Sequence, residues 1–570
     1  MNEKTKNSRG VITVMISLML TGILSLGTMV IEAGRLQAAR TQLDDANLSA
    51  GTSMIAAYNA VLYERFGLLA IDNDRFSLER FRDYLEFNSE RDGVYGGNNI
   101  STFYTVKTAE LEGLYNLTYP AVLKRQLTSR AKYHVIPQDY ALNYYNMDYF
   151  LEDYQSKAAF VSEQLGAVAS NGSQSDIPAE MSEALGYLYE VFGNIKEYDE
   201  TYNVTVSDAD MSLLPSRTGT VESTVFADDA QVINAAVRDA GTVLGSSAAS
   251  LASGGSSVYS ETDVSVNISS PVDYLGTAVN PQTLASNAGE IVSTCRKLVQ
   301  GINAALNMLS ADREGTLLLN SYIAGYFPNK NFAVDGYSGN AGGAAVSGVN
   351  SSAFAGACVE YAVSGDKSEI NNQQTAYKYI IATRLVGNLY SVIKNSSSFN
   401  AGSACSAAAH IAWAYFESCA DTELLFRYNA VVPLNKDSMI LPVDNPSAVG
   451  SAFASKEFPD AMKALGILQE DKIAVGGYDK TNYRDALALA LWFVPNSKKM
   501  LRVADLVQLE MRFREVHVEK TSASFLMSEQ NTFCRVKCTG NLNSVLPVIS
   551  LNGSSGVKGT PIQSIKYVGY

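Results

Sequence analysis

Few residues of this chain have the type and spacing that catalysis requires. Its three histidines, His134, His410 and His517, stand far apart, and only Cys405 and His410 are near each other in sequence. Five residues apart on one predicted helix, these two side chains point in different directions, whereas a thiol nucleophile needs its base within hydrogen-bond reach. We therefore interpret both as core residues and expect no catalytic residue and no enzymatic activity.

The spacing of the cysteines argues against short-range disulfides and against a zinc site. On an extended strand Cys534 and Cys538 lie about 13 Å apart, and on an Ala-rich helix Cys405 and Cys419 lie about four turns apart, so neither pair can be bridged. Cys534 and Cys538 alternate with polar residues and should share one face of a strand. Long-range disulfides and buried free thiols both stay open for the six cysteines: Cys295, Cys358, Cys405, Cys419, Cys534 and Cys538.

Motifs for metals and cofactors are missing from the sequence. Asp72 and Asp74 hint at a calcium loop, but the glycine and the distant bidentate glutamate of an EF-hand are absent, which favours a plain turn. No glycine-rich dinucleotide loop, phosphate loop or GxSxG nucleophile motif occurs. We expect no metal ion and no cofactor.

The element that positions everything else is an uncharged stretch, Gly10–Ile31. At about 1.5 Å per residue, one helix of this length crosses a hydrocarbon core of roughly 30 Å. Lys4, Lys6 and Arg9 precede it, and positively charged flanks stay in the cytoplasm. We expect a single-pass protein of the cell membrane, with residues 1–9 inside and the body extracellular. A cleaved signal peptide is the alternative, although its apolar region usually has about 7–15 residues.

The membrane helix is expected to continue as a stalk helix over residues 32–67. No proline interrupts this segment, and Gly67 is a natural C-terminal cap. A continuous helix from Val11 to Phe66 would be about 84 Å long. An ordinary helical hairpin of the outer domain is the alternative. Small and apolar residues recur every seven positions in two rows, a seam that favours close helix packing: Leu36, Leu43, Ala50 and Ala57, and Ala39, Ala46, Ser53 and Ala60.

Within the membrane segment, small polar residues form a stripe. Thr13, Ser17, Thr21 and Ser25 are spaced by four, with Gly22 beside them. Small residues at this spacing let helices approach closely in lipid, so we expect this face to pack against other helices, including those of a homo-oligomer. A lipid-facing helix whose hydroxyls bond to their own backbone is the alternative.

Composition indicates a folded and acidic body. The formal net charge is −14, which argues against nucleic acid as a partner because phosphates require Lys and Arg. Hydrophobic residues make up 46% and charged residues 18% of the chain, values typical of globular proteins. The expected fold is α+β and rich in helix: a transmembrane helix, its stalk, and then a large extracytoplasmic body over residues 68–570.

Periodicity within that body predicts mostly helices. The exceptions are a strand at Val106–Leu117, short strands after about Phe513, and Ser/Gly-rich loops near 245–257 and 336–356. Helices are predicted near 150–170, 178–197, 227–240, 282–309, 371–394 and 403–427, and two near 481–511 divided at Pro495.

Several segments resemble one family of known proteins. The apolar start leads into IEAGRLQAARTQLDDANLSAGTSMIAAYNAVLYERFGLLAID, which resembles the N-terminal region of TadE/TadG-like pseudopilins. More closely, the chain is similar to a family of large single-pass proteins of unknown function encoded with Tad-type pilus genes in Gram-positive bacteria. The similar outer segments begin at Ala121 (AVLKRQ), Tyr322 (YIAGYFPN), Val359 (VEYAVSGDKSE), Ala412 (AWAYFESCADTELL) and Tyr483 (YRDALALALWF).

The resemblance implies a role at an extracellular filament, with pilus subunits and assembly machinery as partners, and it carries over no catalytic or binding residue. Type IV pilins are typically cut after a glycine that precedes the apolar helix, with a glutamate five residues further on. Gly10 stands in that setting as a processing site, but Met15 occupies the glutamate position.

The function expected from these observations is a structural or assembly component of a Tad-like pilus: a minor pseudopilin, a tip protein or a platform protein. A surface-anchored adhesin or sensor unrelated to filaments is the second interpretation, and an anchored hydrolase is the third.

Overall fold

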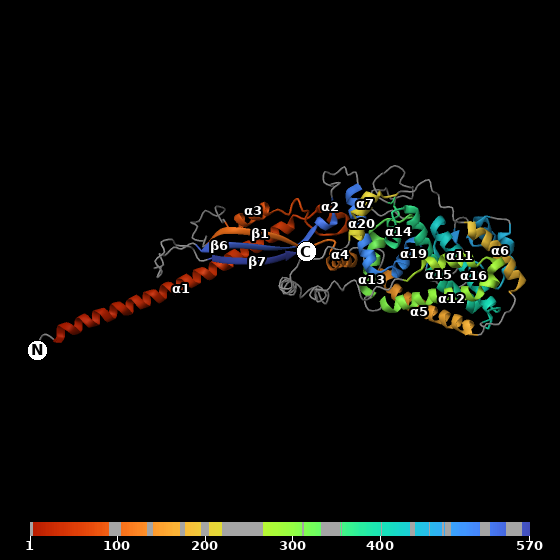
Figure 1. Cartoon of the computed structure of the whole chain (residues 1–570), viewed down its shortest axis with the longest axis horizontal. Coiled ribbons are helices and arrows are strands. Elements are labelled where there is room, and N and C mark those ends of the chain that lie inside the picture. Colours follow the sequence, from red (N-terminus) through yellow and green to blue (C-terminus); the bar gives the residue numbers. More distant parts are fainter. Residues whose placement is uncertain are drawn as a thin grey trace.

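The chain forms an elongated molecule in which one long helix projects from a small sheet, and a large helical body lies at the other end (Figure 1). The computed structural model describes residues 4–89, 104–133, 141–170, 177–194, 205–218, 266–309, 313–331, 354, 356–400, 402–433, 439–454, 457–469, 472–473, 480–513, 525–542 and 561–570. His134, His517, the helix predicted at 227–240, the loop near 245–257 and most of the loop near 336–356 lie outside these ranges.

Helices dominate the described residues, and strands are few. In chain order the elements are α1 (Lys4–Ala56), α2 (Ala60–Phe66), α3 (Leu78–Ser89), β1 (Tyr104–Asn116), α4 (Pro120–Arg130), α5 (Ala141–Ser170), α6 (Ala179–Asn194), α7 (Asp208–Ser212), α8 (Pro215–Thr218), α11 (Ser269–Ala278), α12 (Pro281–Leu309), α13 (Arg313–Tyr326), α14 (Cys358–Ser364), α15 (Glu369–Asn395), α16 (Ala404–Tyr428), β2 (Val432–Pro433), α17 (Pro446–Phe453), α18 (Phe458–Ala464), β3 (Leu468–Gln469), β4 (Lys472–Ile473), β5 (Lys480–Thr481), α19 (Tyr483–Ala490), η5 (Leu491–Phe493), α20 (Asn496–Phe513), η6 (Met527–Glu529), β6 (Asn531–Leu542) and β7 (Pro561–Gly569).

The sheet beside α1 is antiparallel, with strand order β1-β6-β7, so its middle and one edge come from the end of the chain. Along β6, buried and half-buried residues alternate strictly, and Cys534, Val536 and Cys538 are on the buried face, as the sequence predicted. The other face carries cross-strand ion pairs between Glu110 and Lys537 and between Glu112 and Arg535. One face is therefore apolar and the other polar, which is usual for an antiparallel sheet covered on one side.

The second half of α1 covers the apolar face of this sheet. Ala39, Leu43, Ala46 and Ala50 are buried in a small core together with residues of α3, β1, β6 and β7. Asn47 joins the two layers, because its Nδ2 donates to the Val536 carbonyl at 3.2 Å and to Ser564 Oγ at 3.0 Å. The predicted seam is therefore a packing face. Its partners are the protein's own sheet and α3. Small side chains let a helix lie close to strands as well as to other helices.

The stalk is shorter than the sequence indicated. α1 ends at Ala56, and the chain bends through Tyr58 and Asn59 before α2 begins. Asn59 caps α2 by accepting from the Leu62 N–H at 3.1 Å, and its own N–H donates to the Ala70 carbonyl at 2.8 Å. Asparagine favours a cap over a helix interior because its side chain competes for backbone groups. Gly67 does end α2, in the left-handed conformation with φ of 68°.

The large body has a separate hydrophobic core built mainly from α5, α6, α12, α15, α16, α19 and α20, with α2 included. α16 lies at its centre, and every residue from Cys405 to Phe426 is buried except Tyr415. The predicted helices near 150–170, 178–197, 282–309, 371–394 and 403–427 correspond to α5, α6, α12, α15 and α16. α19 and α20 flank Pro495, also as predicted.

The two hydrophobic cores do not follow the expected division of the chain into a stalk over residues 32–67 and a body over residues 68–570. The small core holds the second half of α1, α3 and the three-stranded sheet, whereas α2 belongs to the large core. The body is inserted between β1, which ends at Asn116, and β6, which begins at Asn531. β1 and β6 are nonetheless hydrogen-bonded neighbours along most of their length.

The close approach of α1 to the sheet predicts the effect of enlarging Gly51. A Cβ at Gly51 would lie 2.9 Å from Cγ2 of Val568 and 3.1 Å from Cγ2 of Val536, whereas Gly34 faces open space. Gly51→Leu should lower stability by about 1–3 kcal/mol through overpacking. Gly34→Leu should be neutral or stabilise by about 0.5–1 kcal/mol, because leucine is the better helix former.

Thermal unfolding of the full chain in detergent, with hydrogen exchange of the β6 and β7 amides, measures both effects. Equal protection of these amides in the two variants would mean that α1 does not rest on the sheet in solution.

Candidate functional site

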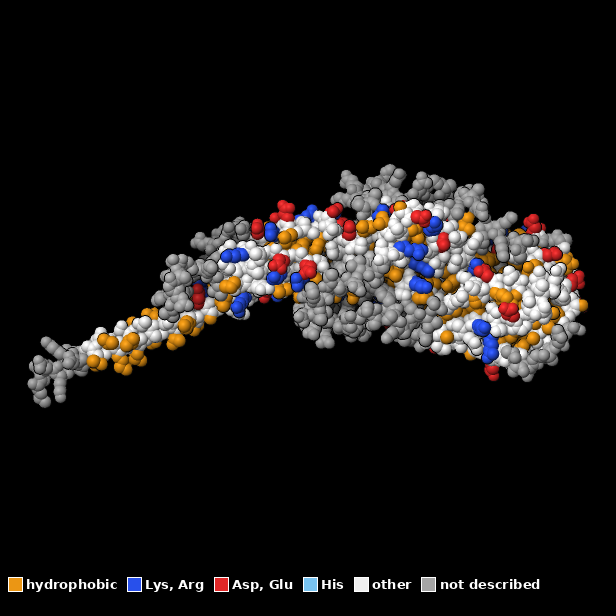
Figure 2. Space-filling view, in the orientation of Figure 1, with side chains coloured by type: hydrophobic (Ala, Val, Ile, Leu, Met, Phe, Trp, Pro, Cys, Tyr) orange, Lys and Arg blue, Asp and Glu red, His pale blue; other side chains and the backbone are white. Residues whose placement is uncertain are grey.

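The first half of α1 is the clearest functional feature of the described residues. All residues from Gly10 to Ile31 are exposed, and this is the one described helix long and apolar enough to cross a membrane. Figure 2 shows hydrophobic side chains along this projecting part, and no charged residue interrupts them between Gly10 and Ile31. An apolar helix exposed on all sides is unfavourable in water, so this half of α1 is compatible with a membrane anchor.

The polar stripe within this segment makes hydrogen bonds along the helix itself. Thr21 Oγ1 donates to the Ser17 carbonyl at 2.8 Å, and Thr28 Oγ1 donates to the Ser25 carbonyl at 2.8 Å. A Cβ at Gly22 or Gly10 would meet nothing within 4 Å. Back-bonded hydroxyls are compatible with a lipid-facing helix and with close packing alike, so the packing face of Thr13, Ser17, Thr21, Gly22 and Ser25 stays a prediction.

This stripe and the sheet-covered face lie on the same side of α1. Within the stripe, Thr21 precedes Ala39 and Ser25 precedes Leu43 by 18 residues each, which is about five turns at 3.6 residues per turn. Because α1 is one uninterrupted helix, Thr21 and Ser25 project in the same direction as Ala39 and Leu43, about five turns further along the helix. A partner helix seated on the stripe would therefore lie on the side where the sheet lies.

Three passes of the chain meet where the sheet joins the body, at residues 58–71, 116–117 and 530–531, which we call the neck. The N–H of Ile71 donates to the Asn531 carbonyl at 2.9 Å, and the N–H of Asn531 donates back to Ile71 at 3.0 Å. Leu117 N–H donates to the Gln530 carbonyl at 3.0 Å, and Asn116 pairs with Asn531 in the sheet. The connection between sheet and body is thus a hydrogen-bonded extension of the sheet.

Side chains fasten α2 and the residues just after it to three helices of the body at the neck. Arg65 pairs with Glu510 of α20 at 3.2 Å, with both side chains almost buried. Tyr322 of α13 donates its hydroxyl to the Phe66 carbonyl at 2.6 Å. Gln126 of α4 bonds both the N–H and the carbonyl of Leu69, at 2.8 and 2.9 Å. These contacts hold α2 and the residues that follow it against the body.

His410 and Cys405, which lie close together in the sequence, make separate contacts within the body. Nδ1 of His410 is 2.6 Å from the Ser406 carbonyl, its Nε2 is 2.7 Å from Ser396 Oγ, and its ring packs edge-on against Phe399. Burial lowers the pKa of His410. The Cys405 thiol instead faces the Ala285 carbonyl at 4.0 Å, so the two side chains form no pair.

Each of the six cysteines is described, and each is a buried free thiol. Burial raises the pKa of Cys295, Cys534 and Cys538 to about 12, which keeps these thiols protonated and unreactive at neutral pH. The Asp72 carboxylate accepts from Asn59 at 2.8 Å within a tight turn. Among the described residues, no three His, Cys, Asp or Glu side chains are grouped so that they could hold a metal ion.

Buried charged residues, which the sequence analysis did not single out, hold the body together. Glu417 of α16 accepts from the Ile440 and Leu441 N–H groups, both at 2.7 Å, and so fixes the segment before α17. Arg384 of α15 donates to the carbonyls of Val432 and Pro433 in β2. The only sequence signal for these roles is a charge on a helix that is otherwise apolar or small, as in the AAAHIAWAYFESCADTELLF run of α16.

Glu360 of α14 is the most unusual of these groups. It is fully buried, and its Oε1 accepts from the Tyr483 hydroxyl at 2.9 Å and from the Lys330 N–H at 3.0 Å. Its second oxygen, Oε2, has no hydrogen-bond partner. Burial raises the pKa of Glu360 from 4.5 to about 7, although its hydrogen bonds oppose that rise.

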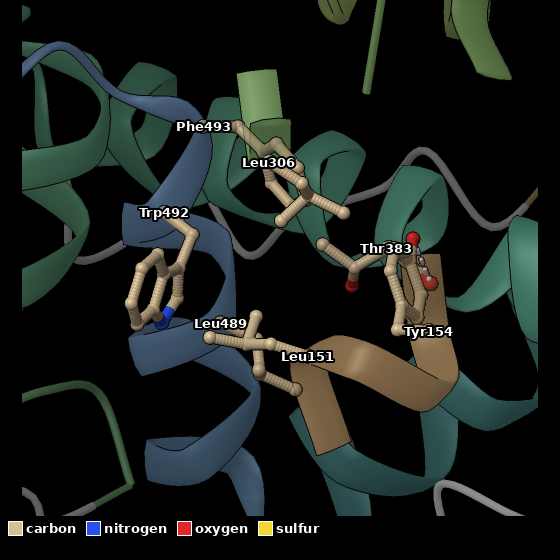
Figure 3. Close-up of a pocket in the computed structure, with 7 residues that line it drawn as sticks. All are labelled: Leu151, Tyr154, Leu306, Thr383, Leu489, Trp492 and Phe493. Atoms are coloured by element: carbon tan, nitrogen blue, oxygen red, sulfur yellow. Dashed lines mark hydrogen bonds between the residues drawn. The ribbon is translucent and has the colours of Figure 1, made fainter. Parts of the chain in front are cut away.

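One crevice inside the body is too small for a ligand. It has a volume of about 10 Å³ and is lined by Leu151, Tyr154, Leu306, Thr383, Leu489, Trp492 and Phe493 (Figure 3). Tyr154 closes one side by donating its hydroxyl to the Thr383 carbonyl at 2.9 Å. A space of this size holds at most one water molecule, so it is a packing defect between α5, α12, α15, α19 and η5.

Comparison with known proteins identifies no relative of this chain. No protein-family model, no curated protein and no solved structure matches it.

The raised pKa of Glu360 predicts how stability depends on pH. The folded state holds this proton up to about pH 7 and the unfolded state only up to 4.5, so stability is fully present below 4.5 and falls as pH rises to 7. Glu360→Gln keeps a carbonyl oxygen for both hydrogen bonds but does not ionise. As the pH rises from 5 to 8, the free energy of unfolding of Glu360→Gln, minus that of the unaltered protein, should increase by about 2–3 kcal/mol.

Urea unfolding at a series of pH values measures this difference. The exposed Glu183, changed to Gln, is the matched control and should give a curve parallel to that of the unaltered protein. If the free energy of unfolding of Glu360→Gln also runs parallel to that of the unaltered protein across this pH range, Glu360 is already ionised at pH 5 in the folded state.

Proposed function

We propose that this protein is a membrane-anchored extracytoplasmic component of a Tad-like pilus, acting in structure or assembly as a minor pseudopilin, tip or platform protein. The observation that carries the proposal is the division of α1 into two halves. The first half is exposed and apolar, and the second half is fixed to the sheet formed with the end of the chain. A filament subunit requires both: an apolar helix that moves from lipid into a filament core, and a folded part that travels with it.

The length of free helix supports a membrane location for this junction. Ile31 ends the apolar span and Ala39 is the first residue buried against the sheet, so about 12 Å of helix separates them. The sheet would then lie close to the membrane surface, and the body would lie beyond it. The basic residues before Gly10 favour an orientation with the N-terminus inside and the body outside.

The stripe of Thr13, Ser17, Thr21, Gly22 and Ser25 is the proposed contact with neighbouring membrane helices. Small side chains permit close backbone approach, which gains dispersion contacts that lipid tails do not provide as well. Since this stripe faces the side of the sheet, its partner would pack beneath the protein's own sheet. Other pseudopilins and a second copy of this chain are both partners of that chemistry.

The size of the body favours a low-copy component over a filament shaft. The insertion of residues 117–530 gives a radius of gyration of about 22 Å for a compact body. Packed helices lie only about 8–10 Å apart, so bodies of this width could not accompany every helix of a closely packed core. A subunit that starts, caps or anchors the filament has no such restriction.

The proposed topology predicts which sites are open to reagents outside the cell. All six native thiols are buried, so they add little background to labelling with a membrane-impermeant maleimide. In intact protoplasts the exposed Lys463, changed to Cys, should label, and Ser8, changed to Cys, should label only after lysis. Labelling of Ser8→Cys in intact protoplasts, or protection of Lys463→Cys there, would reverse the topology.

The proposed filament role predicts the phenotype of membrane-helix variants. Deleting the gene should remove most surface filaments. Complementation with a chain in which Ser17, Thr21 and Ser25 are Leu should restore insertion but not filaments, and its membrane cross-links to partner helices should fall several-fold. The matched control replaces Met15, Met19 and Ile23, on the opposite face, by Leu and should restore both.

Electron microscopy of filaments and cross-linking in membranes measure these outcomes. Normal filaments in the deletion strain would refute the proposal and favour an adhesin or sensor. Abundance of this chain as the main subunit of isolated filaments would refute the low-copy assignment.

A further inference from the structure

A cavity large enough for a small molecule lies within the body. Its volume is about 230 Å³, and it lies between α6, α11, α15 and α16. Figure 1 places these helices at the end of the body farthest from the N-terminus of α1. Under the proposed topology this end would face away from the membrane, but the cavity itself does not depend on that proposal.

The inner wall of the cavity is apolar. Val272 of α11 is buried and Ile381 of α15 is almost fully buried, and both line it together with the buried thiol of Cys419. Phe192 of α6 forms a further part of the wall and is held in place by stacking on Phe416 at 5.9 Å between ring centroids. A wall of this kind binds an aliphatic or aromatic group by removing it from water.

Two opposite charges stand side by side at the same cavity. Asp273 of α11 and Lys378 of α15 form an ion pair at 2.9 Å, and their side chains are 56% and 30% exposed. Exposed ion pairs contribute only about 0–1 kcal/mol, so exchanging each partner for a charge on a ligand costs little. A lysine beside an aspartate complements a zwitterion, since the ammonium accepts a carboxylate and the carboxylate accepts an ammonium.

Gly276 maintains the close approach of α11 to α16 at the cavity. A Cβ at this position would lie 2.7 Å from the hydroxyl of Tyr415, which also lines the cavity. Glycine therefore lets the tyrosine hydroxyl stand against the α11 backbone. Gln374, one turn before Lys378 on α15, adds an amide to the polar side of the cavity.

We propose that this cavity binds a free α-amino acid with an aliphatic or aromatic side chain. The side chain would enter between Phe192, Val272 and Ile381, the ligand carboxylate would bind Lys378, and the ligand ammonium would bind Asp273. The volume is below the roughly 300–1,000 Å³ of pockets for larger ligands, which suits a molecule of this size.

Calorimetric titration of the full-length protein in detergent tests the proposal with five compounds. L-leucine and L-phenylalanine contain all three recognised groups, whereas glycine lacks the side chain, leucinamide lacks the carboxylate and N-acetyl-leucine lacks the ammonium. L-leucine or L-phenylalanine should bind saturably. Each incomplete compound should bind at least about tenfold more weakly, the usual loss for a hydrogen bond to a charged group or for a buried apolar side chain.

Two variants assign the charges to their partners. Lys378→Met should weaken L-leucine binding at least about tenfold without further weakening leucinamide, which already lacks the carboxylate. Asp273→Asn should likewise weaken L-leucine but not N-acetyl-leucine. Lys367→Met, which removes the exposed pair with Asp208 at 2.8 Å elsewhere on the body, is the matched control and should leave binding unchanged.

Three results would overturn the proposal: no saturable heat with either complete compound at millimolar concentration, equal binding of the complete and incomplete compounds, or binding that is unaffected by both charge variants. In the first case the ion pair would serve only to hold α11 against α15. If a variant fails to fold, the comparison of the five compounds on the unaltered protein still decides.

Discussion

The contact on which the rest of the structure depends is the packing of the second half of α1 against β6 and β7. It brings residues of α1 against β6 and β7, which lie far along the chain. The apolar seam of α1 is buried only when these two strands are present. Because β1 and β6 are neighbours in the sheet, the two ends of the segment between them, residues 117–530, are held side by side at the sheet. The neck then extends this sheet by a few hydrogen bonds and fastens α2 into the body. The second half of α1 is thus fixed by apolar burial, whereas its first half is exposed.

The body is stabilised in a different way. Its central helix, α16, is buried on all sides, so its polar residues cannot reach water and must bond within the protein. Glu417 satisfies two backbone N–H groups of a segment that has no regular structure of its own. One carboxylate oxygen of Glu360 has no hydrogen-bond partner, and burial raises the pKa of this group. These charges specify where irregular segments lie, at a cost in desolvation that a purely apolar core would avoid.

The sequence predicted local elements better than contacts between distant elements. The apolar span, the strand containing Cys534 and Cys538 and the helices of the body follow from periodicity and caps, which are properties of neighbouring residues. The seam at Leu43 and Ala50 was recognised, but its partner was not, because a row of small residues fits a helix and a sheet alike. The bend at Asn59 was missed because an asparagine inside a helical pattern signals a cap only weakly. The cavity between α6, α11, α15 and α16 joins residues from four separate helices, and nothing in their spacing connects them.

The insertion of the body between two paired strands also has a consequence for synthesis. The helix α1 is synthesised before the body, whereas the strands that cover its seam, β6 and β7, are synthesised more than four hundred residues later. Until β6 and β7 are made, Leu43 and its neighbours lack the strands that cover them, while most of the body has already been synthesised. Pairing across more than four hundred residues is slow, since it closes a very long loop. A chain truncated anywhere before β6 would therefore present an uncovered apolar helix face.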